Sequence, residues 1–407
     1  MLERKNAFWN MIGASLNAFT SLVFVIIVSW INGQGPAGVF SFGFSCAIIF
    51  YCIANYINRP FQVTDISGKY SDSDYIYFRL FTCAFSLIPP VVYSLLNGYN
   101  LNKFLIILLL CVYRASEAFT ETFYSVTQKN GFLYKVGFSM SIRAILGIGL
   151  FFAIDLLFKN LILATVSLTA VNILVFVLYD YRSAKSSGLT TTKYNKRLWT
   201  LLSIGFSNFV LTILNIFIVN VGRYAIDKYC SDTTQAIYGY ILMPATVMCL
   251  LAQYIIQPVI VNISASIKEK NYLVFKKYIK NSLLLLSAVM AIVLVCAYLL
   301  EVPVLSIVYH CDLAPYKKEA MLIIFGAVFF GFETTISLVL VAMRKINVQA
   351  ILFFVVTAIS VIISFMPKKN TNLCTASTAY LITMVLISVS LFAVLIVNMK
   401  KYKKDWN

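Results

Sequence analysis

Long apolar runs recur along the whole chain and constrain its fold more than any other feature. Each is about as long as the roughly 20 residues with which a helix crosses the hydrocarbon core of a bilayer. The segments between the runs are short, so none can hold a soluble catalytic domain. The sequence therefore predicts an all-α integral membrane protein with about 12 transmembrane helices. We expect these helices at 8–31, 37–57, 76–97, 101–126, 132–157, 160–180, 198–223, 236–262, 278–300, 319–342, 347–366 and 373–398.

The composition agrees with a chain whose main solvent is lipid. Of the 407 residues, 60% are hydrophobic and 12% are charged, whereas soluble domains are about half apolar and a quarter charged. The net charge of +17 comes from basic residues that cluster between the apolar runs. This clustering favours orientation against an anionic inner leaflet over binding of nucleic acid.

Lysine and arginine are distributed unequally between alternate loops. With the N-terminus inside, the cytoplasmic segments hold 23 of them and the external loops hold eight, while Arg114 and Arg143 lie within helices. The segments 181–197 and 399–407 are among the richest on the inner side. By the positive-inside rule, both termini are therefore expected in the cytoplasm.

Weak similarities in collinear order suggest that the chain contains an internal repeat. A shift of 198 residues aligns Tyr56 and Pro60 with Tyr254 and Pro258, and further matches occur before and after this helix. The repeat predicts two pseudo-symmetric lobes of six helices, at 1–188, including a cytoplasmic linker, and at 189–407. Six helices is an even number, so both lobes enter the membrane in the same sense, which suits alternating access; a channel is the alternative.

Several ionisable residues fall at membrane depth, where they are costly and seldom face lipid. Arg114, Glu117 and Glu121 share one face of a helix, because they are three and seven residues apart. Arg143 and Glu333 lie on other helices. One interpretation is an internal Arg–Glu pair that holds the bundle together. The other is a hydrated face that handles a polar or anionic substrate and whose carboxyls titrate during transport.

Two further charged motifs stand at helix ends. The first contains Arg59, Gln62 and Asp65 at the inner end of the second helix; its arginine either snorkels to the interface or grips phosphate. The second contains Arg223 and Asp227, four residues apart, at the outer end of the seventh helix, followed by Lys228. It forms either a structural ion pair or part of an outer gate.

The remaining chemistry of the sequence is sparse. The nine cysteines show no metal-type spacing, and His310 is the only histidine. Cys230, Cys311 and Cys374 fall in or near external loops, where their disulfide state stays open. No Walker-type phosphate loop and no nucleophile–base arrangement is present. We therefore expect no metal, no cofactor and no enzymatic activity.

Three motifs resemble those of the polysaccharide transporters of the MOP superfamily, with the Wzx-type O-antigen and capsule flippases as the best match. They are Arg59…Gln62…Asp65, the stretch from Arg223 to Tyr229, and Glu117 followed by Gln128-Lys129-Asn130. With the two-lobed layout, the resemblance extends over nearly the whole chain.

This resemblance implies a flippase in the bacterial plasma membrane. Its substrate would be an undecaprenyl-pyrophosphate-linked oligosaccharide, moved from the inner to the outer leaflet during O-antigen, lipopolysaccharide or capsule biosynthesis. Partners would be this lipid-linked substrate, membrane lipids, and a polysaccharide polymerase and chain-length regulator. The implied residues are Arg59, Arg114, Arg143 and Arg223 for the cationic cavity, Glu117, Glu121 and Glu333 for coupling or ion pairing, and Gln62, Asp65, Asp227 and Lys228 for gates.

Other activities are less compatible with the sequence. The drug exporters of the same superfamily couple to cations through carboxylates in the first or seventh helix, where this chain has Asn17 and Asn215 but no mid-depth carboxylate. Lipid II flippases usually have two more helices than the 12 expected here. Polymerases and ligases of oligosaccharides need a large external loop, which is absent. A cation-coupled exporter of small molecules remains the alternative.

Overall fold

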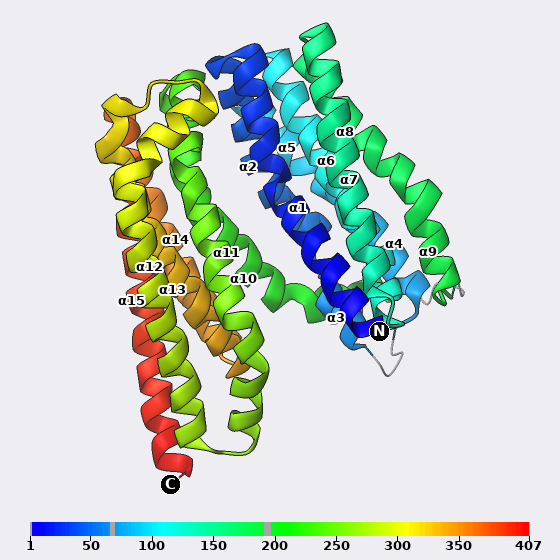
Figure 1. Ribbon diagram of the computed structural model, residues 1–407, viewed down its shortest axis with the longest axis vertical. Coiled ribbons are helices and arrows are strands. Elements are labelled where there is room, and N and C mark those ends of the chain that lie inside the picture. Colours follow the sequence, from blue (N-terminus) through cyan, green and yellow to red (C-terminus); the bar gives the residue numbers. More distant parts are fainter. Residues whose placement is uncertain (1, 66–69, 191–196, 407) are drawn as a thin grey trace. The chain divides into compact units, whose positions relative to one another are not determined.

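Each apolar run forms one helix or a pair of consecutive helices, as the sequence predicts (Figure 1). The computed structural model describes residues 2–65, 70–190 and 197–406. Up to residue 190 the helices are α1 (Leu2–Asn32), α2 (Gln34–Ala54), α3 (Arg59–Thr64), α4 (Asp72–Ser86), α5 (Ile88–Leu96), α6 (Leu101–Lys129), α7 (Leu133–Phe158), α8 (Leu161–Val175), the π-helical turn η1 (Phe176–Asp180) and α9 (Tyr181–Ser186). After residue 196 they are α10 (Leu198–Tyr229), α11 (Asp232–Lys268), α12 (Tyr272–Tyr309), η2 (Ala314–Tyr316), α13 (Lys317–Ala342), α14 (Ile346–Phe365), η3 (Lys368–Asn370) and α15 (Leu373–Trp406).

The helices have the length and composition of membrane spans. Within the described ranges, 11 helical segments are long and apolar enough to cross a bilayer. Helix α6 has 29 residues and is the twelfth; it differs from the others because Arg114, Glu117 and Glu121 lie near its middle. The prediction of an all-α fold with about 12 membrane-length helices is therefore confirmed.

Local sequence explains where the helices begin and end. Ser71 starts α4 with a reciprocal cap, because its hydroxyl accepts from the Asp74 amide at 3.1 Å and the Asp74 carboxylate accepts from the Ser71 amide at 3.1 Å. The same run stops at Ser86, just before Pro89 and Pro90, whose rings and missing N–H groups prevent continuation of the hydrogen-bond ladder. One predicted span is therefore two helices, α4 and α5.

The contacts divide the chain into two units, Met1–Phe209 and Val210–Asn407, and the division falls within α10. We call them unit 1 and unit 2. The predicted six-helix lobes at 1–188 and 189–407 stay a prediction.

In unit 1, α1 and α7 pack with their backbones in direct contact. A Cβ atom at Gly13 would overlap the carbonyl of Gly137, and one at Gly137 would overlap the carbonyl of Trp9. Small residues at such crossings are typical of membrane helices, where close packing replaces the hydrophobic effect between helices. The buried rings of Phe24 and Phe151 continue this contact, with centroids 5.0 Å apart.

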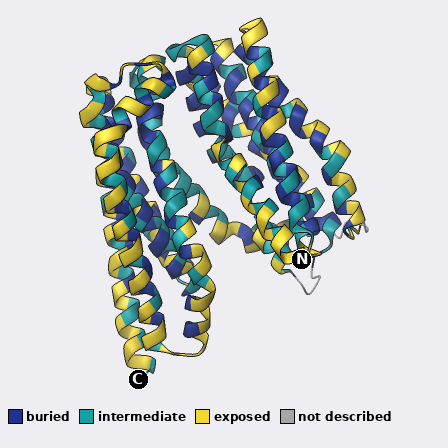
Figure 2. Ribbon diagram, in the orientation of Figure 1, coloured by how far each residue is buried: buried dark blue, intermediate teal, exposed yellow. Residues whose placement is uncertain are grey.

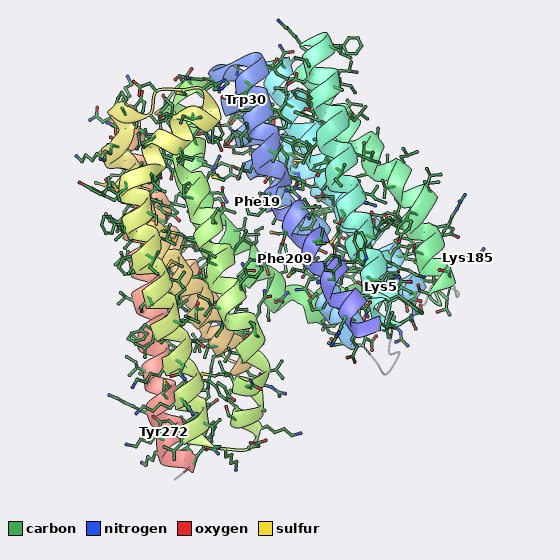
Figure 3. The ribbon with its side chains drawn as sticks, viewed as in Figure 1. Lys5, Phe19, Trp30, Lys185, Phe209 and Tyr272 are labelled. Atoms are coloured by element: carbon green, nitrogen blue, oxygen red, sulfur yellow. The ribbon has the colours of Figure 1, made fainter. Side chains whose placement is uncertain are left out.

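Figure 3 shows Lys5 and Trp30 at opposite ends of α1, with Phe19 between them. Trp30 is half exposed, as expected for an aromatic side chain at a membrane interface.

In unit 2, α13 packs against α11, α12 and α15. Gly326 and Gly331 allow this, because added Cβ atoms would lie 2.7 Å from the Tyr380 ring and 2.6 Å from Met290 Cε, respectively. Figure 2 shows many exposed residues on the helices of this unit, and those on α12 include large apolar side chains such as Leu299. Exposed apolar helix faces are what contact with lipid requires.

The repeat-related helices α2 and α11 differ in continuity. Helix α2 ends at Ala54 and the chain resumes helical structure at Arg59, with the Asn58 side chain capping α3. Helix α11 continues without interruption through Pro258, which the sequence alignment matches to Pro60. Broken helices at membrane depth are a recurrent feature of transporter binding sites, so the α2–α3 break in unit 1 is where the description of the site starts.

Candidate functional site

Arg79 on α4 fills the break between α2 and α3. Its side chain is only 3% exposed. It donates to the carbonyl of Ala54 at 2.7 Å, to the carbonyl of Ile57, and to the Thr122 hydroxyl at 3.1 Å. Carbonyls at a helix C-terminus have no partner in their own helix and carry the negative end of the helix dipole. The buried guanidinium of Arg79 donates hydrogen bonds to these carbonyls, and its positive charge balances the negative end of the dipole. It thereby fixes the geometry of the break.

The short helix α3 then places Arg59 against α6. Gln62 is buried and donates to the carbonyl of Thr122 at 3.3 Å, which fastens α3 to the same turn of α6 that binds Arg79. One turn earlier, Arg59 Nε lies 3.3 Å from Glu121 Oε2. The structure thus brings together two candidates from different motifs, Arg59 and Glu121.

A second pair lies two turns away along α6. Arg114 Nη1 donates to Glu117 Oε2 at 2.6 Å. Both pairs remain partly accessible: the side chains are 24% and 15% exposed for Arg59 and Glu121, and 16% and 15% for Arg114 and Glu117. Each arginine also keeps a buried nitrogen without an acceptor, Arg59 Nη1 and Arg114 Nε. The two cations therefore have unused hydrogen-bonding capacity.

Arg143 has a different environment. It is buried and donates to the carboxylate of Asp180 and, at 3.1 Å, to the Thr120 hydroxyl. Asp180 is the last residue of the π-helical turn η1, and such turns often occur at functional sites. The carboxylate partner of Arg143 is thus Asp180, and neither Glu117 nor Glu121 forms an ion pair with it.

Asp65 connects three segments at the end of α3. Its carboxylate accepts from the Tyr75 hydroxyl and from the Tyr70 amide, both at 3.1 Å. Its carbonyl accepts from Lys129 Nζ at 2.6 Å. The gate candidate Asp65 therefore joins α3 to α4 and to the end of α6.

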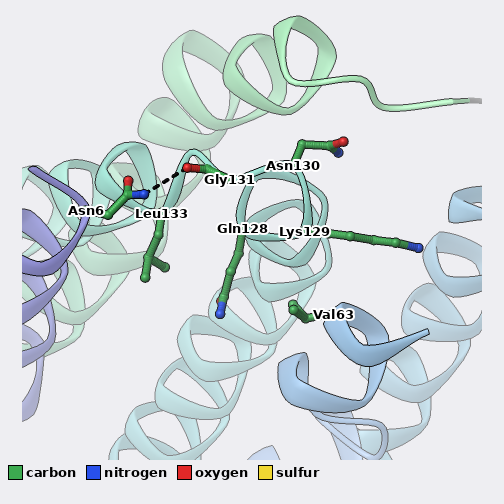
Figure 4. Close-up of a pocket in the computed structure, with 7 residues that line it drawn as sticks. All are labelled: Asn6, Val63, Gln128, Lys129, Asn130, Gly131 and Leu133. Atoms are coloured by element: carbon green, nitrogen blue, oxygen red, sulfur yellow. Dashed lines mark hydrogen bonds between the residues drawn. The ribbon is translucent and has the colours of Figure 1, made fainter. Parts of the chain in front are cut away.

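A hollow of about 610 Å³ opens beside this junction, and Figure 4 shows its lining. Asn6 donates to the carbonyl of Gly131 at 2.9 Å, which ties α1 to the α6–α7 turn. Gln128 and Lys129 extend from the end of α6 in different directions (Figure 4). The side-chain carbonyl oxygen of Gln128 has no hydrogen-bond partner. The Gln128-Lys129-Asn130 stretch thus lines a polar recess on the side predicted to be cytoplasmic.

In unit 2, Glu333 of α13 is buried, with 1% exposed. Its carboxylate accepts from Asn215 Nδ2 of α10 at 3.1 Å and from the Thr334 hydroxyl at 3.2 Å. The Thr334 hydroxyl in turn lies 3.5 Å from Cys249 Sγ. Within the described parts of the chain, no lysine or arginine pairs with Glu333. A carboxylate held by neutral hydrogen-bond donors can take up a proton without breaking an ion pair.

The motif at the end of α10 lies on continuous helix. Helix α10 extends to Tyr229, so Arg223 and Asp227 are one turn apart on it, as the sequence predicts. Arg223 follows Gly222, where an added Cβ would lie 2.5 Å from the Tyr238 hydroxyl of α11. Lys228 Nζ lies 5.8 Å from the centre of the Tyr229 ring. Helices α10 and α11 are therefore closely packed at Gly222, next to the arginine.

All nine cysteines are free thiols in the structure, including Cys230, Cys311 and Cys374.

Two important charged residues carry no distinguishing signal in the sequence. Arg79 lies about two turns into its helix, where the long side chain of an arginine normally reaches the interface. Asp180 adjoins the basic segment that starts with Arg182, so it resembles a loop residue. Their roles depend on contacts with the α2–α3 break and with η1, and such contacts between distant segments leave no pattern in the sequence.

Glu301 of α12, also buried, has no hydrogen-bond partner for either carboxylate oxygen.

No family model matches the sequence, and no curated protein matches it. Several solved structures, however, are similar to this chain in fold. The lipid II flippase MurJ in an inward closed conformation superposes with a TM-score of 0.71 at 17% identity, covering 97% of this chain and 90% of that one. An inward-facing MATE-family multidrug transporter of the MOP superfamily superposes with a TM-score of 0.64 at 12% identity, covering 97% of this chain and 99% of that one.

A point mutant of the Vibrio cholerae MATE transporter VcmN gives a TM-score of 0.64 at 11% identity, with 99% of this chain and 97% of that one covered. These similar structures are transporters and a flippase rather than enzymes. The chain therefore has the fold shared by the lipid II flippase MurJ and the MATE transporters of the MOP superfamily.

Proposed function

We propose that this protein is a flippase for undecaprenyl-pyrophosphate-linked oligosaccharides. It would move O-antigen or capsule repeat units from the inner to the outer leaflet of the bacterial plasma membrane by alternating access. Similarity in fold to MurJ supports a lipid-linked substrate. The motifs that resemble those of Wzx-type flippases support an oligosaccharide headgroup.

One observation carries the proposal. Arg59 and Arg114 lie in a membrane-embedded unit, are partly accessible, and each keeps a buried nitrogen without an acceptor. A diphosphate that enters a low-dielectric environment must replace the hydration of its charges, and guanidinium groups do this with paired, charge-assisted hydrogen bonds. The accessible parts of these guanidinium groups are where a diphosphate would bind first, and the buried free donors add hydrogen-bonding capacity once the ion pairs open.

The carboxylates give this site two states. In the absence of substrate, Glu121 and Glu117 neutralise the arginines, so no unpaired cation is left at membrane depth. When a diphosphate binds, it replaces the carboxylates as the partner of Arg59 and Arg114. Release of the substrate restores the ion pairs, and this exchange makes uptake reversible.

The other candidates take supporting roles in the proposal. Arg143 is already hydrogen-bonded to Asp180 and Thr120. We therefore propose that it stabilises the packing of α6, α7 and η1 and does not make the first contact with substrate. Gln62 and Asp65 hold α3 and thereby orient Arg59. The outer motif of Arg223, Asp227 and Lys228 is proposed to act as a gate on the exit side, as its place at the end of α10 permits.

Deletion of the gene tests the function in cells. The proposal predicts loss of surface polysaccharide and accumulation of lipid-linked repeat units in the inner leaflet. Wild-type protein should restore both, and a variant with Arg59→Gln and Arg114→Gln should not, although it is present at normal level. Normal surface polysaccharide in a deletion strain that has no second flippase contradicts the proposal.

The Glu333 site favours a second candidate, a cation-coupled exporter of small molecules. A buried carboxylate that contacts only Asn215 and Thr334 suits binding and release of a proton or sodium ion. The similar MATE structures include multidrug transporters. Glu333 is also compatible with the flippase, because an ion gradient could drive the same exchange of lipid-linked substrate.

Transport under imposed gradients separates the two functions. Proteoliposomes should be tested with a cationic dye and with a lipid-linked oligosaccharide, each with and without proton and sodium gradients. Dye export without movement of the lipid establishes the exporter. Movement of the lipid that loses its gradient dependence in Glu333→Gln assigns Glu333 to coupling of the flippase.

A further inference from the structure

A second hollow, of about 510 Å³, opens at the end of unit 2 that the charge distribution assigns to the outside. It is formed where α10 ends and where α11, α13 and α15 begin. Its volume is in the range of small-molecule sites in proteins. The lining residues that matter here are Tyr229, Thr234, Tyr316, Glu319, Thr371 and Asn372.

The hollow contains a buried polar group without a partner. Thr371 is 7% exposed, and its hydroxyl makes no hydrogen bond. The Thr371 carbonyl, in contrast, accepts from Cys230 Sγ at 3.3 Å. An unsatisfied buried hydroxyl is unfavourable, because its lost hydration is not replaced by a hydrogen bond. A ligand that hydrogen-bonds to Thr371 Oγ1 would replace the lost hydration.

The electrostatics of the hollow favour a neutral ligand. Three helix N-termini meet there, which disfavours a cation. The carboxylate of Glu319 lines the hollow, which disfavours an anion. The nearby amine of Lys317 is directed to the Tyr298 ring, 4.8 Å from its centre. Burial raises the pKa of the Cys230 thiol above its ordinary value, so this residue adds no negative charge.

Two half-buried tyrosine rings supply apolar surface beside these polar groups. Tyr229 is held in place by Phe365, with ring centroids 6.2 Å apart at 68°. Tyr316 approaches from η2. Aromatic rings with a polar edge, an acidic residue, an amide and the free Thr371 hydroxyl together match a pyranose, which has flat C–H faces and hydroxyls that both donate and accept.

We propose that this outer hollow binds a neutral saccharide unit of the translocated headgroup as it emerges. The proposal rests on the flippase function, because it takes its ligand from that substrate. It adds a separate subsite on unit 2 that selects for sugar, whereas the arginines of unit 1 select for diphosphate. Retention of the emerging sugar on the outer side would oppose its return.

Sugar binding can be measured without transport. The full-length protein is placed in nanodiscs of phosphatidylethanolamine and phosphatidylglycerol, since glycoside detergents would compete. Saturation-transfer NMR is recorded with maltose, lactose and N,N′-diacetylchitobiose, and with inorganic phosphate as an anionic competitor. We expect at least one disaccharide to bind, phosphate not to compete, and Tyr316→Ala and Thr371→Val each to weaken binding about tenfold, equivalent to about 1.4 kcal/mol.

Tyr254→Ala is the matched control, because it removes an exposed tyrosine of the same unit that does not line the hollow. If Tyr316→Ala fails to fold, binding by the near-isosteric Thr371→Val tests the proposal alone. Absence of disaccharide binding, equal loss in Tyr254→Ala, retained binding in Thr371→Val, or competition by phosphate each overturns the proposal. Failure of the flippase is seen separately, as absence of lipid-linked transport by wild-type protein whose sugar binding is intact.

Discussion

Substitution of Glu121 by Gln removes the carboxylate that holds Arg59, and we expect it to tighten the binding of a polyprenyl diphosphate. In the wild-type protein the diphosphate must displace Glu121 before it gains full access to the Arg59 guanidinium. The glutamine keeps the size of the side chain and loses its charge. Tighter binding should be accompanied by slower turnover, because the carboxylate no longer helps to release the product.

The size of the effect follows from the geometry of the pair. Arg59 Nε and Glu121 Oε2 are 3.3 Å apart, and opposite unit charges at this distance attract by about 5 kcal/mol at an effective dielectric constant of about 20. The side chains are 24% and 15% exposed, so solvent screens part of this attraction, and fully exposed pairs contribute at most about 1 kcal/mol. We expect about 1–2 kcal/mol, or a five- to thirtyfold lower Kd.

The assay uses the purified protein and a short-chain, water-soluble polyprenyl diphosphate, with binding followed by calorimetry. Glu301→Gln is the matched control, because it removes one buried carboxylate of unit 2 without touching Arg59 or Arg114. Its Kd should equal that of the wild-type protein. An unchanged or higher Kd for Glu121→Gln refutes the exchange of carboxylate for diphosphate.

Three further substitutions test the supporting structure. Arg143→Met should lower stability by about 3–5 kcal/mol, because it leaves the Asp180 carboxylate buried and unpaired; adding Asp180→Leu should restore the thermal midpoint, and no recovery would argue against the pair. Gly137→Ala should destabilise the α1–α7 contact by about 1–3 kcal/mol, whereas Gly149→Ala, which faces open space, should leave the thermal midpoint unchanged. Arg79→Gln should weaken diphosphate binding about as much as loss of the Arg59 charge, because the α2–α3 break loses its fixed geometry; wild-type affinity in this variant would show that the break is held by other contacts.

Much of the fold follows from patterns that the bilayer imposes. A membrane helix needs a long apolar run, so the spans could be predicted and some of their ends closely, for example 347–366 against the observed α14 (Ile346–Phe365). The span expected at 76–97 contains Pro89 and Pro90, and the structure divides it just before them.

The interruption of α2 could not be predicted in the same way. Asn55 to Asn58 contain no proline, and the aligned segment of α11 is helical through Pro258. Locally, α3 begins with the Asn58 cap and has Pro60 in its first turn, whereas the residue of α11 aligned with Asn58 is Ile256. The break is completed by a tertiary contact, because Arg79 satisfies the carbonyls that it exposes. A contact between residues that are far apart in sequence leaves no local signal.

The sequence predicted which residues belong to the charged site, but it did not predict which of them form ion pairs with each other. Spacing placed Arg114, Glu117 and Glu121 on one face of α6, and the structure shows two of them paired with each other and the third with Arg59. Sequence could not separate Arg143 from these residues, because its partner Asp180 lies on a π-helical turn. Pairing depends on how helices cross, which apolar periodicity does not determine.

The central claim, that the protein moves lipid-linked oligosaccharide, is tested most directly in proteoliposomes. Undecaprenyl-pyrophosphate-linked oligosaccharide is placed in one leaflet, and its arrival in the other is measured with a membrane-impermeant glycosidase. The account predicts protein-dependent transfer that falls at least about tenfold in the variant with Arg59→Gln and Arg114→Gln, equivalent to about 1.4 kcal/mol in the barrier. Transfer that is absent with wild-type protein, or equally fast in the variant, contradicts the account.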